Sequence, residues 1–132
     1  MVIFDSSILI EDLRTGRYSR RIAELYELVR TSSVVLAELW RGSTTSAEER
    51  FLRRLEGNYP IFTPTETNWL ESGQILRRVQ REHGFQAAKL RDMHFDVLIA
   101  LTARTHGTRL ITSNRGDFEL IRGYRDFKLE VW

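Results

Sequence analysis

Two acidic residues in the N-terminal part of the chain, Asp5 and Glu38, stand among apolar residues where a carboxylate could be functional. Asp5 directly follows the apolar run 2–4. It could cap the next helix or serve as a ligand, because the serines behind it could cap that helix equally well. Glu38 is surrounded by apolar residues in the segment 34–40, and Glu is seldom buried unless it is paired or binds a metal. We interpret both as candidate functional carboxylates.

Further candidate residues lie in the C-terminal half of the chain. Asp96 precedes the apolar segment 97–103 and is predicted to open its helix, as an electrostatic cap or as a ligand. Asp92, four residues earlier, could cap that helix or stand beside Asp96. Asp117 follows a strand-like run through turn residues and could cap a short helix. Asn114 lies closer to the end of that run and is a neutral alternative ligand or water-orienting group.

If these carboxylates converge, they need a compensating cation, because like charges that lie close together cannot all stay ionised. The chain has no Cys, and its three His residues show no ligand spacing. Hard oxygen ligands select Mg²⁺ or Mn²⁺ over zinc or copper. Such an ion can activate water and neutralise a phosphodiester, so the inferred reaction is metal-assisted phosphodiester hydrolysis. The residues predicted to hold the ligands in place are Ser6, Asp92, Thr112 and Asn114.

The elements that must position these residues are short apolar runs alternating with helical patterns. This alternation predicts a three-layer α/β/α fold with a mostly parallel central sheet of four to five strands. Ligands of such sheets bind beyond the carboxyl ends of the strands. A helical face is predicted over 18–29, and capping boxes are predicted at 46–49 and 63–66. The predicted strands are 2–4, 29–31, 61–62, 109–112 and 128–131.

Length and composition narrow the class of protein. The 132 residues have the size of one domain, and we expect a single nuclease domain over 1–132. The lack of Cys excludes disulfide scaffolds, thiolate zinc sites and thiol catalysis. No apolar run is long enough to cross a bilayer and no signal peptide is recognisable, so a cytoplasmic location without membrane contact is predicted. The net charge of +2 permits a polyanionic partner without requiring one.

Four short motifs occur along the chain in a fixed order. They are Asp5-Ser6-Ser7, Ala37-Glu38-Leu39 with Arg41-Gly42 behind it, Asp96-Val97-Leu98-Ile99-Ala100, and the segment 112–118. Together they resemble the motifs of PIN-domain ribonucleases, and most closely those of the VapC-type toxins of bacterial toxin–antitoxin pairs. The resemblance implies a PIN-like fold, a single-strand-directed endoribonuclease that uses Mg²⁺ or Mn²⁺, a homodimer, and inhibition by a cognate antitoxin protein.

The same resemblance implies catalytic and metal-binding roles for Asp5, Glu38 and Asp96. Relatives place the fourth ligand either at the position of Asn114 or at that of Asp117, and we predict Asp117, with Asn114 assisting. The alternative function is a catalytically inactive PIN-like module that binds RNA or a partner protein. Five arginines could contact RNA phosphates, although a solvated helix face explains them as well: Arg53, Arg54, Arg77, Arg78 and Arg81.

Overall fold

Five parallel strands form one sheet with the order β3-β2-β1-β4-β5. The computed structural model describes all residues from 1 to 132. Val2 of the central strand lies opposite Val29 on one side and opposite Arg109 on the other. The predicted α/β fold with a mostly parallel sheet of four to five strands is confirmed. The strands are β1 (Val2–Phe4), β2 (Val29–Ser32), β3 (Ile61–Phe62), β4 (Arg109–Thr112) and β5 (Leu129–Val131).

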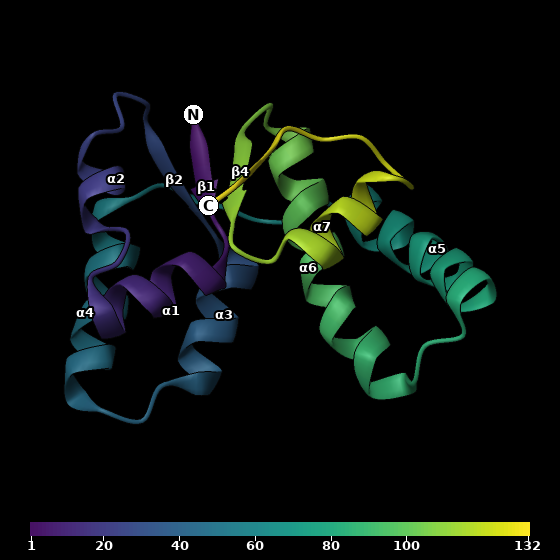
Figure 1. Ribbon diagram of the computed structural model, residues 1–132, viewed down its shortest axis with the longest axis horizontal. Coiled ribbons are helices and arrows are strands. Elements are labelled where there is room, and N and C mark those ends of the chain that lie inside the picture. Colours follow the sequence, from purple (N-terminus) through teal and green to yellow (C-terminus); the bar gives the residue numbers. More distant parts are fainter.

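Seven helices surround the sheet and complete the three layers. Figure 1 shows α1, α2 and α4 on one side of the strands and α5, α6 and α7 on the other, with α3 between them near the strand ends. The helices change side where the chain crosses from the edge strand β3 back to β4, as right-handed crossovers require. They are α1 (Ser6–Thr15), α2 (Ser19–Ala23), α3 (Ser33–Gly42), α4 (Ser46–Asn58), α5 (Glu66–His83), α6 (Ala87–Thr105) and α7 (Arg115–Arg122).

The core is centred on β1 and α6. All three residues of β1 are buried, as expected of a parallel strand covered on both faces. In α6 every residue from Val97 to Ala103 is buried, so this half of the helix is apolar all round. Because α6 packs against the sheet here, the residue that precedes this stretch, Asp96, is held in a fixed place.

Three sequence predictions about helices are wrong in detail. The helical face expected over 18–29 is divided: α2 ends at Ala23, Tyr26 is fully exposed, and Val29 begins β2. Apolar residues at helical spacing therefore belong here to two different elements. The two capping boxes are displaced along the chain. Thr45 caps α4 by accepting from the N–H of Glu48, and Thr65 caps α5 together with Asn68.

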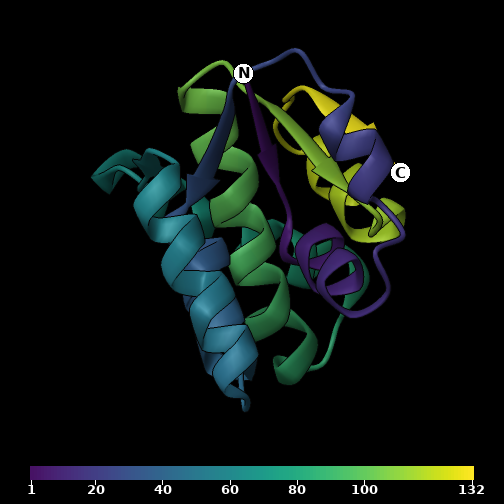
Figure 2. The same ribbon diagram turned by 90° about the vertical axis from the view of Figure 1, so that its left-hand side faces the viewer.

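The carboxyl ends of the three central strands meet at one edge of the sheet. In Figure 2 the arrows of β2, β1 and β4 lie side by side and run in the same direction, and α1 begins directly beyond β1. Asp5 follows β1, Ser32 ends β2 and caps α3, and Thr112 ends β4. Candidate residues that are far apart in the sequence are therefore neighbours in space.

Candidate active site

Asp5 is the most deeply buried carboxylate at this edge, with 3% of its surface exposed. It occupies the cap position of α1, but its side chain makes no capping hydrogen bond. Instead its Oδ2 accepts from Ser7 Oγ at 2.8 Å and from Thr112 Oγ1 at 2.9 Å. Its Oδ1 is buried and has no hydrogen-bond partner. Burial raises the pKa of Asp5, and the hydrogen bonds oppose that rise.

Glu38 lies in the middle of α3, on a helix whose neighbouring positions Val34, Val35 and Leu39 are buried. Its Oε1 is a buried acceptor with no partner. Burial and the negative charge of Asp5 raise the pKa of Glu38 to about 7, while the positive charge of Arg41 acts in the opposite direction. The carboxylates of Glu38 and Asp5 therefore interact directly through their charges.

Asp96 does not open a helix, contrary to the sequence prediction. It lies nine residues after Ala87, the first residue of α6, so neither Asp96 nor Asp92 caps the helix. The sequence does not reveal that the helix begins as early as Ala87. The residues of its first two turns show no continuous apolar pattern, and only Met93 among them is fully buried. Burial and the charges of Asp5, Glu38 and Asp117 raise the pKa of Asp96 to about 8, while the charge of Lys89 acts to lower it.

Asp117 lies in the first turn of α7, on the outer side of the other three acids. It does not cap α7, because Asn114 does so. One oxygen of Asp117 accepts from Lys89 Nζ at 2.7 Å, and the other accepts from Asn114 Nδ2 at 3.2 Å. The backbone N–H of Asn114 in turn donates to Thr112 Oγ1. A continuous chain of hydrogen bonds thus connects Asp5 with Asp117.

The four predicted acids share one region, and their charges are unbalanced there. Asp5, Glu38 and Asp96 form no ion pair, while Asp117 pairs with Lys89. In this arrangement no three Asp, Glu or His side chains lie close enough together to hold one ion. Binding of a divalent ion therefore requires these side chains to rotate toward a common point. The unpartnered oxygens of Asp5 and Glu38 fit such an ion, since a buried acceptor without a donor is costly.

The supporting residues agree only in part with those predicted. Thr112 and Asn114 hold Asp5 and Asp117 as described. No hydrogen bond joins the Ser6 side chain to Asp5. The serine hydroxyl that donates to Asp5 comes from Ser7 instead. Asp92 is exposed, and its charge raises the pKa of Glu38 only as the last of several causes.

The five arginines predicted to contact RNA do not form one surface. Arg53 and Arg54 lie on α4, and Arg77, Arg78 and Arg81 lie on α5, at opposite ends of the molecule in Figure 1. The basic side chains whose charges reach the carboxylates are Arg41 and Lys89. The sequence assigns neither of them a role at the site, although Arg41 stands in one of the quoted motifs, because a single basic residue on a helix carries no signal of what lies opposite it.

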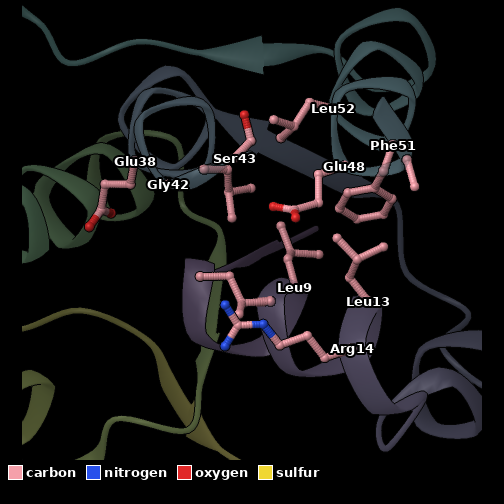
Figure 3. A pocket seen from close by; sticks show the side chains of 12 residues that line it. Leu9, Leu13, Arg14, Glu38, Gly42, Ser43, Glu48, Phe51 and Leu52 are labelled. Atoms are coloured by element: carbon pink, nitrogen blue, oxygen red, sulfur yellow. The ribbon is translucent and has the colours of Figure 1, made fainter. Parts of the chain in front are cut away.

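An apolar groove between α1, α3 and α4 adjoins the carboxylates. It has a volume of about 300 Å³. Figure 3 shows Leu9, Leu13, Phe51 and Leu52 around it, while the carboxylate of Glu38 is turned away from them at one end. Arg14 and Glu48 also line the groove. It therefore reaches the acidic site only at Glu38, and its walls suit an apolar peptide segment better than a phosphate.

A family model for the PIN domain matches residues 2–123. The chain belongs to the PIN-domain family. The four acids singled out in the sequence analysis lie near one another at the edge of this PIN domain. No curated protein matches the chain. None of its helices combines the length and the apolar character needed to span a bilayer.

Solved structures share the fold of this PIN domain over almost the whole chain. VapBC-1 from nontypeable Haemophilus influenzae has a TM-score of 0.73 at 22% identity, covering 100% of this chain and 98% of that one. VapBC2 from Rickettsia felis, solved with a fragment of its promoter DNA, has a TM-score of 0.71 at 23% identity, covering 100% and 99%. VapC20 from Mycobacterium tuberculosis, a sarcin–ricin loop cleaving toxin, has a TM-score of 0.66 at 18% identity, covering 97% and 99%.

The hydroxyl of Thr112 makes a testable contribution to stability at this site. Thr112 is fully buried and donates to a buried carboxylate, so the isosteric substitution Thr112→Val leaves Asp5 Oδ2 with one donor fewer. We expect the free energy of unfolding at neutral pH to fall by about 1–3 kcal/mol, measured by urea denaturation. Thr67→Val, on an exposed residue in the first turn of α5 whose hydroxyl makes no hydrogen bond, is the control. An unchanged urea midpoint for Thr112→Val would contradict this account of the site.

Proposed function

We propose that this PIN domain is a metal-dependent endoribonuclease of single-stranded or loop RNA and the toxin of a toxin–antitoxin pair. We further propose that residues 1–132 form a single nuclease domain acting in the cytoplasm. The observation that carries the proposal is that the carboxylate of Asp5, directly after β1, shares one region with carboxylates of α3 and α6 and that none of the three has a paired cation. A domain that only bound RNA would gain nothing from repulsion among buried acids, because repulsion costs stability.

We assign the ion, Mg²⁺ or Mn²⁺, to Asp5, Glu38 and Asp96. When bound, the ion would supply an activated water and neutralise charge on the phosphodiester. The chain's own contribution is to keep the ligands available. Ser7 and Thr112 hold Oδ2 of Asp5 and leave its Oδ1 free. Asp117 is the fourth acid of the site, and its negative charge raises the pKa of Asp96.

Incubation with RNA tests the reaction directly. The purified protein and its Asp5→Asn variant are incubated with structured and unstructured RNA, in Mg²⁺ and in a chelator. We expect the wild-type protein in Mg²⁺ to cleave unstructured RNA and the loops of structured RNA. We expect no cleavage by Asp5→Asn, and none by either protein in the chelator. Cleavage that survives the chelator would overturn the proposed mechanism. RNA binding without cleavage in Mg²⁺ would favour the inactive binding module instead.

We propose that a cognate antitoxin protein inhibits the enzyme by occupying the apolar groove. The groove supports this because its walls are largely apolar, with Leu13 exposed and Phe51 half-buried, and it ends at Glu38, so an occupant would lie beside the acidic site. We also propose that the protein is a homodimer. Two large apolar residues of α5, Trp69 and Leu70, are more than half exposed and offer a surface for a second copy. Light scattering tests the dimer.

A charge placed in the groove is expected to separate inhibition from cleavage. Leu13 is 40% exposed on its wall, so Leu13→Asp should fold normally while opposing an apolar partner. We expect the variant to cleave RNA as the wild type does, but to remain toxic when the proposed antitoxin is co-expressed. Neutralisation of the variant as complete as that of the wild type would place the antitoxin elsewhere.

A further inference from the structure

One basic side chain at the mouth of the site is not explained by the fold. Only two of the 20 basic residues of the chain are lysines, Lys89 and Lys128. Lys89 lies in the first turn of α6, and its ammonium reaches Asp117 Oδ1 in the first turn of α7 at 2.7 Å. Its positive charge also lowers the pKa of Asp96. Lys89 is thus the cation that approaches the acids from the α6–α7 side.

Stability gives little reason for a lysine at this position. A positive charge in the first turn of a helix is unfavourable, because the amino end of the helix is itself positive. The ion pair with Asp117 is partly exposed, with 42% of the Lys89 side chain and 26% of the Asp117 side chain accessible. Exposed pairs of this kind contribute little to stability. The position of Lys89 is therefore better explained by a ligand than by the fold.

The hydrogen bonds of the site distinguish Asp117 from Asp5 and Glu38. Both oxygens of Asp117 have donors, Lys89 Nζ on one and Asn114 Nδ2 on the other. Oδ1 of Asp5 and Oε1 of Glu38 have none. An ammonium has three N–H donors, and one of those of Lys89 goes to Asp117. The other two are available at a partly exposed position next to the acidic site, where a phosphate could receive them.

We propose that Lys89 binds a backbone phosphate of the RNA at the mouth of the site and that Asp117 holds the ammonium in place for it. This inference rests on the proposed function, because it takes RNA to be the substrate. It gives Asp117 a role different from the ligand role that the family resemblance implies. Asp117 acts through Lys89, and Asp5, Glu38 and Asp96 bind the divalent ion.

Substitution of Lys89 is expected to change RNA binding and metal binding in opposite directions. Lys89→Met removes a positive charge that contacts phosphate, so the dissociation constant for a single-stranded RNA should rise about tenfold. The slope of log affinity against log salt should become shallower by about 0.7. The same loss of charge beside the acids should tighten Mn²⁺ binding by roughly threefold or more. RNA affinity is measured by fluorescence anisotropy in chelator, and Mn²⁺ affinity by titration calorimetry without RNA.

The controls separate charge from structure. Lys89→Arg keeps the charge and should retain most of the RNA affinity and the wild-type salt slope. Lys128→Met removes the other lysine, which precedes β5 and so lies at the opposite, amino end of the parallel sheet. It should change neither constant. Weaker binding of both RNA and Mn²⁺ to Lys89→Met would show a merely structural role, and unchanged RNA affinity would also overturn the proposal.

The same measurements distinguish a failure of the nuclease proposal from a failure of the role proposed for Lys89. If the wild-type protein neither binds Mn²⁺ nor cleaves RNA, the nuclease proposal fails, whereas the anisotropy comparison in chelator still decides the role of Lys89. If the wild-type protein binds Mn²⁺ and cleaves RNA but Lys89→Met binds RNA as tightly as Lys128→Met does, the nuclease proposal stands and the assignment of Lys89 is wrong.

Discussion

Asp96→Asn is expected to reduce RNA cleavage in Mg²⁺ by about a thousandfold or more while leaving the fold intact. Metal-ion catalysis lowers a reaction barrier by several kcal/mol, and each 1.4 kcal/mol corresponds to about tenfold in rate. Asp96 interacts through its charge with all three other acids, so its loss should remove both a ligand and the reason for the ion to bind. Initial cleavage rates of a single-stranded RNA at saturating Mg²⁺ give the measurement.

Two matched substitutions serve as controls for Asp96→Asn. Asp126→Asn changes an exposed Asp near β5, away from the site, and should cleave as the wild type does. Asp92→Asn tests the other Asp of α6, which is exposed one helical turn before Asp96, and we expect only a small loss. If Asp92→Asn were as inactive as Asp96→Asn, the assignment of the ligand on α6 would have to move to Asp92.

Without divalent ions, the protein is expected to lose thermal stability as the pH rises from about 5 to about 8. Burial and mutual repulsion raise the pKa of Glu38 to about 7 and that of Asp96 to about 8 in the folded state. The ordinary values are 4.5 and 3.8, so between these limits the folded protein binds more protons than the unfolded chain. The stabilisation is therefore complete below the ordinary values and is lost as the pH rises through 7 and 8.

Bound metal should reverse this dependence, because a divalent ion binds the deprotonated carboxylates of the folded state. We expect the melting temperature in chelator to drop by roughly 5 °C or more across this range. In excess Mn²⁺ it should rise or stay level. Differential scanning fluorimetry at several pH values, with chelator and with Mn²⁺, makes the comparison.

Asp96→Asn is the control for the pH experiment as well. Without a titrating carboxyl at this position, the variant should melt higher than the wild type at pH 8 in chelator and should respond little to Mn²⁺. A wild-type melting temperature that rises with pH in chelator would mean that the acids are not buried together. The electrostatic basis of the proposed site would then be lost.

The sequence alone was enough to predict the strands of the sheet and the candidate acids. Alternating apolar runs and helical patterns predicted the parallel α/β fold and all five strands to within a residue or two, because period and burial of short strands are local properties. Asp5, Glu38 and Asp96 were also singled out locally, by the apolar residues next to them, whereas Asp117 was chosen through the family resemblance. The α2 region and the start of α6 could not be predicted in the same way. Apolar spacing over 18–29 fits a helix although the chain turns into β2, and the polar first turns of α6 hide a helix that begins at Ala87.

Only the tertiary structure decided which groups surround each carboxylate. The contacts between Ser7, Thr112 and Asp5, and between Lys89 and Asp117, join residues of different elements, in most cases many residues apart in the sequence. The crossovers of the sheet set these distances, and no local pattern encodes them. Burial then raised the pKa values of Glu38 and Asp96, since the desolvation of a carboxylate depends on what packs against it rather than on its neighbours in the chain.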